Sequence, residues 1–340
     1  MTGPGQPRVD VSIVIVCMNQ PDDLFQCLDS LARHTHRATY EIWVVAYLFS
    51  EENLGRLRER HPAVRIVESR ELRGFAENNN LALRQVNGEY CFIVNDDTFM
   101  DMPVVDLLLE SFRKEPRASL FSPRILNPDG SVQFCGGLPH TMGHWLLVEF
   151  KLRNPARMKS PLINGTGIFR TCTVMGAAFM VRTAVLRELG YFDERYFFCP
   201  EDSALSMLAN QRGHACYVNA DARIYHKHSG TLGRNALPTV LAMQRGQTLF
   251  HSQGSAARWL AYSSAMFALA AGKFLYWSLS HAPDRAVRAR IWRTAMATAF
   301  SRRTPKEIFA QYYRPAAAAD ADKPAAASGE SAGNGRRTWS

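Results

Sequence analysis

Two pairs of adjacent acids and one histidine have the side chains and the spacing to do chemistry on a charged substrate. Asp96 and Asp97 follow an apolar run, Glu201 and Asp202 follow a run of aromatic residues, and His226 follows a short apolar segment. Adjacent carboxylates repel each other, so such pairs usually face water or a cation. Carboxylate oxygens suit a hard divalent ion. The Asp96–Asp97 pair therefore predicts a cation site at the end of its strand.

Each of these groups also has a purely structural interpretation. Asp-Asp-Thr after a strand can cap the next helix. Glu201 and Asp202 can occupy a first helical turn, where the helix dipole favours acids. His226 can be an ordinary histidine at a strand end, and His228 is interpreted as a bystander. The choice depends on whether the chain brings the groups together.

The elements that must position these residues alternate between strand and helix. The run Tyr90–Val94, which delivers the first acid pair, is one of four apolar or β-branched runs typical of buried parallel strands. Helical segments separate them, as in a doubly wound α/β sheet, whose ligands bind at the carboxyl ends of the strands. The turn after the first strand lacks G-x-G-x-x-G, which counts against a dinucleotide fold. The predicted strands are 11–17, 40–46, 64–68 and 90–94, and the predicted helices are 21–33, 51–60 and 75–86.

The pattern becomes mixed after a further helix over 103–114. The run 174–181 contains Gly176, which suggests a strand that another group approaches closely. Thr183 is a plausible N-cap for a helix over 184–189, which stops at a glycine. Residues 140–167 show no period and predict a long functional loop. The other strands expected here are 118–126, 216–219 and 222–225, and a helix is expected from the second acid pair to about residue 212.

Composition is ordinary for a globular protein, but the charge is unevenly placed. The 340 residues carry a net charge of +9, and six arginines stand between His281 and Arg303 against one acid, Asp284. This charge favours an anionic membrane surface or a polyanionic ligand as the binding partner. No sequence motif for nucleic-acid recognition supports binding to DNA or RNA. The seven scattered cysteines form no CxxC pair, so neither a disulfide framework nor a zinc cluster is expected. A reducing cytoplasm fits, and residues 1–10 do not resemble a signal peptide.

The C-terminal third predicts helices. Residues 259–279 have the length of a membrane span but are a weak candidate, because Lys273 and several serines and tyrosines interrupt them. Residues 287–300 predict an amphipathic basic helix, which either lies on a membrane or packs on its own catalytic domain. We expect a flexible N-terminus (1–10), a catalytic domain (11–235, with a nucleotide-binding half 11–100 and an acceptor half 101–235), a helical region (236–313) and a disordered tail (314–340).

The order of motifs resembles the inverting family 2 glycosyltransferases of GT-A fold, in particular the bacterial rhamnosyltransferase-like branch. The resemblance covers roughly residues 11–233, and each motif is weak alone but the ordered set is specific. The matching segments are Val11–Asn19, Gly74–Ala76 with Asn79 and Asn80, Asn95–Asp97, Ser122–Gly130 with Gly136 and Gly137, Gly176–Arg182, Gly190–Glu194, Glu201–Asp202 and Ala222–Lys227.

The resemblance implies a GT-A fold, a Rossmann-like mostly parallel sheet with a C-terminal helical appendage, and a role for each matched residue. Asn95-Asp96-Asp97 takes the place of the family's DxD motif, with Asp97 as direct ligand of Mn²⁺ or Mg²⁺, His226 as a further ligand and Asp96 at the ribose or near the metal. Asp202 is the expected catalytic base and Glu201 orients the acceptor. The residues expected to bind the nucleotide-sugar are Asn19, Gly74, Asn79, Asn95 and Asp96.

One departure from the family concerns the nucleotide base. The family usually carries an Asp at the end of the second strand, where this chain has Ala46. Asp10, Asn19 or Glu68 are candidate substitutes. The resemblance implies a dTDP- or UDP-sugar as the donor. Which base the protein recognises is left open by the missing acid.

Three hypotheses follow. The first is a metal-dependent inverting glycosyltransferase that acts on a glycan or lipid-linked acceptor in bacterial surface polysaccharide synthesis, cytoplasmic and peripheral on the inner membrane face. The second is a catalytically silent nucleotide-sugar or glycan-binding subunit of an assembly complex. The third, a nucleotidyltransferase, ranks last because the first turn lacks the Gly-rich basic loop which that class needs.

Overall fold

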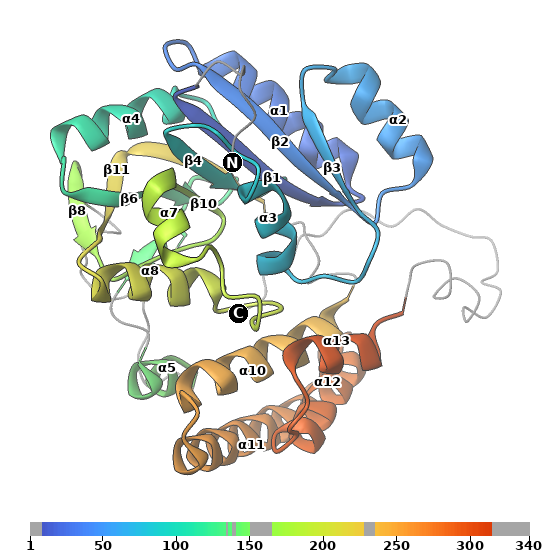
Figure 1. The fold of residues 1–340 in the computed structure, drawn as a ribbon. Helices are drawn as coiled ribbons and strands as arrows, with labels where there is room; N and C mark the ends of the chain where they lie inside the picture. Colours follow the sequence, from blue (N-terminus) through green and yellow to red (C-terminus); the bar gives the residue numbers. More distant parts are fainter. Residues whose placement is uncertain (1–8, 134, 138–140, 150–164, 228–234, 315–340) are drawn as a thin grey trace.

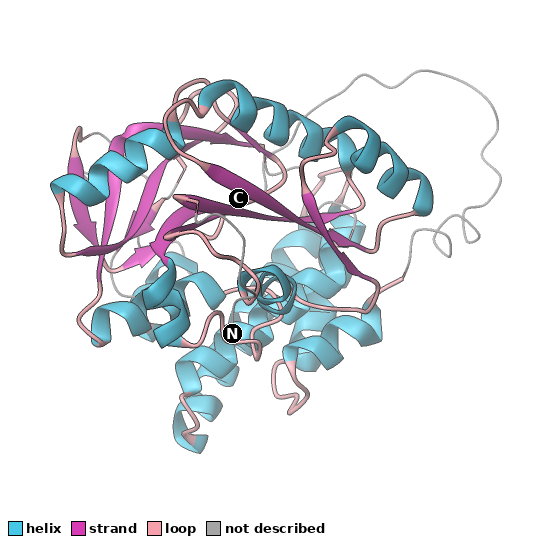
Figure 2. Cartoon of the chain, turned by 45° about the horizontal axis from the view of Figure 1, so that its top comes forward, coloured by secondary structure: helices cyan, strands magenta, loops and turns pink. Residues whose placement is uncertain are grey.

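The computed structural model describes residues 9–133, 135–137, 141–149, 165–227 and 235–314. A twisted sheet with helices on both faces forms the larger part, and a layer of C-terminal helices lies against one side of it (Figures 1 and 2). The predicted α/β fold with a C-terminal helical appendage is confirmed.

The first half of the chain forms the parallel part of the sheet. Strands β1 (Val11–Met18), β2 (Tyr40–Tyr47), β3 (Arg65–Ser69) and β4 (Tyr90–Val94) lie in the order β3-β2-β1-β4. Successive β1 side chains point to opposite faces, and both faces are covered, so almost every residue of this β-branched run is buried. The connecting helices are α1 (Pro21–His34), α2 (Glu51–Arg60) and α3 (Phe75–Leu83).

The second half makes the sheet mixed. Strand β10 (Ala178–Arg182) lies antiparallel between β4 and β6 (Ala118–Leu126), and β11 (Ala215–His226) runs parallel to β6. This places the end of β11 at the same edge as the end of β4. The smaller strands are β5 (Thr98–Phe99), β7 (Gly136–Gly137), β8 (Ile168–Thr171) and β9 (Thr173–Val174), and the helices are α4 (Val104–Lys114), α5 (Met142–Glu149), α7 (Thr183–Leu189) and α8 (Glu201–Gln211).

Several local predictions were wrong. The two short strands predicted over 216–225 are the single strand β11, whose register shifts between Asn219 and Arg223. The predicted loop over 140–167 contains helix α5. Residues 150–164 of this predicted loop lie outside the described part of the chain. Thr183 does not cap α7 but is the first residue of that helix. Its buried hydroxyl donates to the carbonyl of Gly88 at 2.7 Å.

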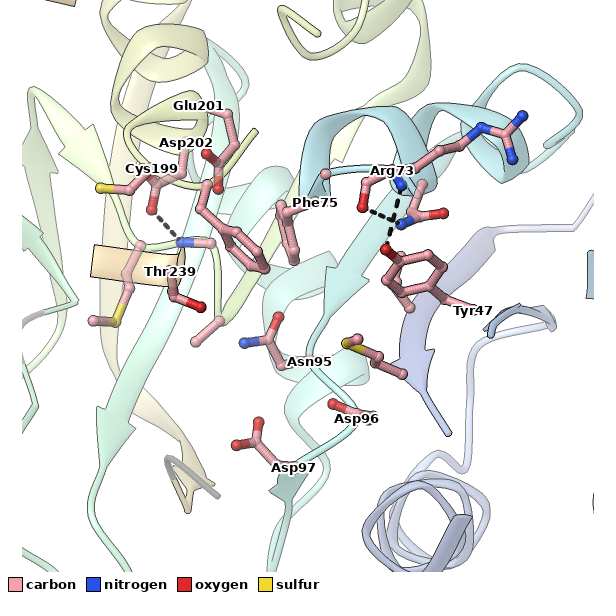
Figure 3. A pocket seen from close by; sticks show the side chains of 18 of the residues that line it. Tyr47, Arg73, Phe75, Asn95, Asp96, Asp97, Cys199, Glu201, Asp202 and Thr239 are labelled. Atoms are coloured by element: carbon pink, nitrogen blue, oxygen red, sulfur yellow. Dashed lines mark hydrogen bonds between the residues drawn. The ribbon is translucent and has the colours of Figure 1, made fainter. Parts of the chain in front are cut away.

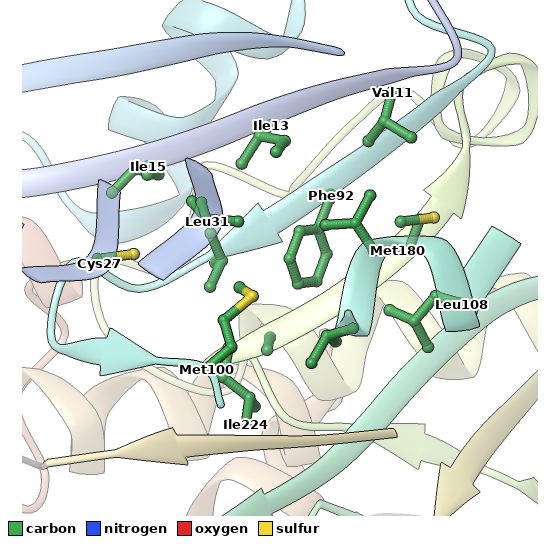
Figure 4. Close-up of a cluster of buried hydrophobic side chains, with 14 of the residues drawn as sticks. Val11, Ile13, Ile15, Cys27, Leu31, Phe92, Met100, Leu108, Met180 and Ile224 are labelled. Carbon is green, nitrogen blue, oxygen red and sulfur yellow. The ribbon is translucent and has the colours of Figure 1, made fainter. Parts of the chain in front are cut away.

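Two apolar clusters hold the sheet between its helices. The larger lies between the sheet and helices α1 and α4, and includes Ile13, Phe92 and Leu108 (Figure 4). The other covers the opposite face, where Val14 and Ile93 pack with α3 and α7 side chains. Neighbouring strand residues thus belong to different clusters, as the two-residue period of a strand requires.

The C-terminal layer consists of α10 (Ala236–Ser252), α11 (Ala256–Leu279), α12 (Arg285–Thr298) and α13 (Pro305–Tyr312). Helix α10 lies between the α/β part and the α11–α12 hairpin (Figure 1). In the described part of the chain, no helix combines the length and the apolar character that crossing a bilayer would need. The weak candidate 259–279 is therefore not a membrane span.

Candidate active site

A cavity of about 330 Å³ lies beyond the end of β4, and side chains of α8 and α10 also line it. Seven of the nine site residues predicted from sequence line it, and they come from α3, the β4 end, α8 and the β11 end. Asp96 and Asp97 lie at one end in the view of Figure 3, Glu201 and Asp202 at the other, and Asn95 between them. The seven are Gly74, Asn95, Asp96, Asp97, Glu201, Asp202 and His226.

Asp97 and His226 meet although 129 positions separate them in the sequence numbering. The Asp97 Oδ1 atom is 3.2 Å from His226 Nε2, and both side chains are more than nine-tenths buried. The Asn95 Nδ2 group lies 3.4 Å from the same ring nitrogen. The two strand ends that carry these residues are joined through β5, which pairs with β11 at His226. The sheet therefore makes one site from the predicted ligands.

A glutamine fixes the tautomer of His226. Gln133 Nε2 donates to three oxygens, the carbonyls of Leu126 and His226 and Asn127 Oδ1, at 3.4, 2.7 and 2.8 Å. This leaves Gln133 Oε1 to face His226 Nδ1, at 2.9 Å. An amide oxygen only accepts, so Nδ1 carries a proton.

With Nδ1 protonated, a neutral imidazole would present a lone pair at Nε2 toward the Asp97 carboxylate, and an imidazolium would donate a proton to it. Two acceptor atoms 3.2 Å apart repel each other unless a proton or a metal cation lies between them. A carboxylate oxygen with an imidazole nitrogen is a donor set that suits Mn²⁺. Among the described residues, no group of three or more His, Cys, Asp and Glu side chains could hold a metal ion. A cation here would take its other ligands from substrate or water.

Asp96 is the second acid of this end. Burial, and then the adjacent Asp97 charge, raise the pKa of Asp96 to about 7. A carboxyl group with such a pKa gains from a positive charge nearby, because the cation favours its ionised form. Both the Asp97–His226 pair and the raised pKa of Asp96 therefore favour a cation at this end of the cavity.

The opposite end is built by the start of α8. Gly176 N donates to Asp202 Oδ2 at 2.7 Å, and Ser203 N donates to Asp202 Oδ1 at 2.6 Å. A side chain at position 176 would put its Cβ 3.3 Å from the carboxylate. The predicted close approach to Gly176 is found, and the approaching group is the carboxylate of Asp202. The predicted strand over 174–181 is wrong at this point, because Gly176 lies in the turn between β9 and β10. These contacts hold the Asp202 carboxylate in one orientation toward the cavity.

Glu201 is buried beside it. Burial, and then the Asp202 charge, raise the pKa of Glu201 to about 8, so its carboxyl group is protonated at neutral pH. Its Oε2 atom has no hydrogen-bond partner within the described part of the chain.

Two residues predicted to bind the nucleotide-sugar do not line the cavity. Asn79 Nδ2 donates to the Phe75 carbonyl within α3 at 2.9 Å. Asn19 Oδ1 accepts from Ser50 N and Asn53 Nδ2 and so holds the start of α2. Both side chains have structural partners in this structure, and Asn78 lines the cavity instead.

The candidate substitutes for the missing base-binding acid are also elsewhere. Asp10 accepts hydrogen bonds from Thr39, and Glu68 pairs with arginines on the surface. The cavity wall near Ala46 is formed by Tyr47 and Arg73, and the Tyr47 hydroxyl accepts from Arg73 N at 3.3 Å (Figure 3).

Sequence reasoning missed several residues of the site. Arg73 directly precedes the Gly-Phe-Ala motif, and Gln133 closely follows the Asn-Pro-Asp-Gly turn, so their positions carried a signal. Thr239 and Met243 of α10 carried none, because helix α10 lies beyond the matching motifs. His228 lies outside the described residues.

Comparison with known proteins decides the family. The profile described as Glycosyl transferase family 2 matches residues 12–189, which is more than half of the chain. The chain belongs to glycosyltransferase family 2. The family predicted from the motifs, and with it the enzyme class, is confirmed.

Two bacterial relatives of this family member are similar over most of its length. The "O-antigen biosynthesis protein RfbC" of Myxococcus xanthus is 28% identical over 245 residues, 69% of this chain but only 18% of that protein. The "N-acetylglucosaminyl-diphospho-decaprenol L-rhamnosyltransferase" of Mycobacterium tuberculosis is 24% identical over 229 residues, 60% of this chain and 71% of that protein. Both support the rhamnosyltransferase-like branch.

Solved structures support the fold of this glycosyltransferase family 2 member. The mannosyltransferase PcManGT of Pyrobaculum calidifontis, solved with GDP-Man and Mn²⁺, has a TM-score of 0.50 at 17% identity and covers 90% of this chain and 87% of its own. GalNAc-T7, solved with UDP, GalNAc and Mn²⁺, has a TM-score of 0.52 at 14% identity and covers 91% of this chain and 59% of its own.

Proposed function

We propose that this enzyme transfers a sugar from a nucleotide-sugar donor to a hydroxyl group of a glycan or lipid-linked acceptor, with inversion and with the help of Mn²⁺ or Mg²⁺. The observation that carries the proposal is that the Asp97–His226 pair and the Asp202 carboxylate line one cavity. A cation site and a base in one cleft are what direct displacement from a diphosphate requires.

The residues divide the work between the two ends of the cavity. Asp202 takes the proton of the acceptor hydroxyl, whose oxygen forms the new bond to the anomeric carbon while the bond from that carbon to the diphosphate oxygen breaks. Gly176 N and Ser203 N keep the Asp202 carboxylate oriented for this. Glu201 orients the acceptor. The nucleoside diphosphate is the leaving group.

Asp97 and His226 would hold the metal ion, with Asp96 and Asn95 beside it. The ion would supply positive charge that stabilises the diphosphate leaving group. Two observations support this assignment. The two similar solved structures contain Mn²⁺, and Asp97 Oδ1 faces His226 Nε2 at 3.2 Å.

The donor is a nucleotide-sugar, and we propose a dTDP- or UDP-sugar. The L-rhamnosyltransferase relative favours an activated deoxyhexose, and GalNAc-T7 was solved with UDP. Tyr47 and Arg73 are the side chains placed to meet the nucleotide end, where the family's usual acid is Ala46.

We place the enzyme on the cytoplasmic face of the membrane, where a lipid-linked acceptor such as that in the relative's name would reside. Among the described residues, every exposed large hydrophobic side chain belongs to α5 or to the segment from α11 to Phe300. They are Leu147, Leu260, Phe267, Leu275, Tyr276, Leu279, Val287 and Phe300. Concentrated exposed apolar surface beside arginines fits a helix pair lying in an anionic lipid surface.

A donor screen tests the transfer proposal. Purified enzyme is incubated with a panel of dTDP- and UDP-sugars and with lipid-linked N-acetylglucosamine, with and without Mn²⁺, and released nucleoside diphosphate and glycosylated product are measured. We expect product with one donor class and none in EDTA. Donor binding without product across the panel would instead support the silent binding subunit.

A further inference from the structure

Helix α10 forms one wall of the active-site cavity. Its Thr239 and Met243 side chains line the cavity together with Glu201 and Asp202. The family profile matches residues 12–189, so α10 lies outside the matched segment, as do Asp202 and His226.

Helix α10 packs closely on the segment that precedes α8. A Cβ at Gly246 would lie 2.2 Å from the carbonyl oxygen of Cys199, so only glycine permits this approach. One residue further along, Gln247 Nε2 donates to Cys199 Sγ at 3.4 Å. Cys199 precedes Glu201 by two residues. The packing of α10 therefore sets the position of Thr239 relative to Glu201.

Two polar atoms on this wall are buried without a partner. Glu201 Oε2 and Thr239 Oγ1 have no hydrogen bond within the described residues, and the two residues are 7% and 2% exposed. A buried polar atom left unpaired destabilises the protein. Both residues line the same cavity, and rotation of their side chains can turn the two atoms toward a single ligand placed there.

We propose that Thr239 and Glu201 form a subsite that binds one hydroxyl group of the acceptor sugar. This rests on the proposed glycosyl transfer and deepens it. A sugar hydroxyl both donates and accepts, so it can donate to one of these side chains while it accepts from the other. A protonated Glu201 donates to the sugar and an ionised Glu201 accepts from it, and the Thr239 hydroxyl rotates to suit either case.

The location favours the acceptor over the donor. In Figure 3, Glu201 and Asp202 lie at the end of the cavity away from Asp97, which belongs to the metal and diphosphate end. The acceptor must bring its reacting hydroxyl to Asp202. A neighbouring hydroxyl of the same sugar then lies within reach of the residue adjacent to Asp202 in the chain.

The test compares Thr239→Val, which removes the hydroxyl at nearly constant volume, with Thr239→Ser, which keeps it. Thr248→Val is the matched control, because Thr248 is a buried threonine of the same helix whose hydroxyl donates to the Gln244 carbonyl at 2.8 Å. Binding of methyl glycosides of rhamnose, N-acetylglucosamine and galactose is measured by calorimetry with Mn²⁺ and UDP or dTDP present. Acceptor and donor KM values are measured alongside.

We expect Thr239→Val to weaken the glycoside that wild type binds by about tenfold, the effect of one lost hydrogen bond. Thr239→Ser and Thr248→Val should stay within about twofold, and all should bind the nucleotide equally. A deoxy glycoside that lacks the contacted hydroxyl should bind wild type and Thr239→Val alike.

Other results overturn the subsite. They are equal glycoside binding by wild type and Thr239→Val, no glycoside binding by wild type, or a rise in donor KM with acceptor KM unchanged. If glycoside binding depends on Thr239 but no donor yields product, the subsite stands and the proposed transfer fails.

Discussion

His226 is held between two acceptors, with Gln133 Oε1 2.9 Å from its Nδ1 and Asp97 Oδ1 3.2 Å from its Nε2. Gln133 thereby determines which ring nitrogen carries the proton and which can bind a cation. Groups that orient a metal-binding histidine in this way typically contribute 10–100-fold to metal affinity.

We expect Gln133→Leu to lower Mn²⁺ affinity in the presence of UDP by about 10–100-fold, because His226 loses its orienting partner. Gln133→Glu keeps an acceptor at Nδ1 and should retain more affinity. Titration of Mn²⁺ followed by electron paramagnetic resonance measures this. Gln85→Leu, on an exposed glutamine, is the control. Unchanged Mn²⁺ affinity in Gln133→Leu would remove the orienting role.

Loss of the metal ligands should abolish metal-dependent turnover. Asp97→Asn and His226→Ala are each expected to lower kcat/KM at least 100-fold, since the diphosphate loses its positive partner. EDTA should inactivate wild type, and added Mn²⁺ should restore it. Steady-state release of nucleoside diphosphate is the measurement. Full wild-type activity in EDTA contradicts a metal-dependent reaction.

Replacing the base should stop transfer but not binding. We expect Asp202→Asn to lower kcat by about 10²–10⁴-fold, the usual contribution of a positioned general base. Nucleotide affinity, measured by calorimetry, should stay near that of wild type because the metal end of the cavity is intact. A thermal melt checks the fold, since Asp202 also accepts from Gly176 N and Ser203 N. A fully active variant would exclude Asp202 as base.

The raised pKa of Glu201 makes stability depend on pH. Glu201 keeps its proton up to about pH 8 in the folded protein, whereas the unfolded chain releases it near 4.5. Between these values the folded state binds more protons, so this group's contribution to the free energy of unfolding falls as pH rises, by about 1.4 kcal/mol per pH unit. Urea unfolding from pH 5 to 8 should show a smaller decline in Glu201→Gln. Equal slopes in both proteins would contradict the neutral Glu201.

The exposed face of the C-terminal hairpin should bind anionic membranes. We expect the enzyme to sediment with vesicles that contain phosphatidylglycerol and to be released by high salt, with weaker binding to pure phosphatidylcholine. Leu275→Ser combined with Leu279→Ser should reduce binding, because these side chains are 60% and 69% exposed and support no core. Equal partition of the double variant and wild type would argue against this face.

The sequence alone determined the alternation of strands and helices and the residues at the strand ends. Short apolar and aromatic runs such as Tyr90–Val94 are typical of buried strands, and the parallel pattern brings their carboxyl ends to one edge. The resemblance to the family implied that Asp97, His226 and Asp202 meet, and the structure brings them to one cavity.

Tertiary structure decided which side chains complete the site. Asn79 matches a motif but turns to its own helix, and Asn80 instead bonds Phe192 across 112 positions. Gln133 lies 93 positions from His226, and Thr239 reaches the cavity only because Gly246 lets α10 pack on Cys199. Local patterns fix the period and burial of each segment. The partners of a polar side chain depend on how distant segments pack, and no short window of sequence contains that information.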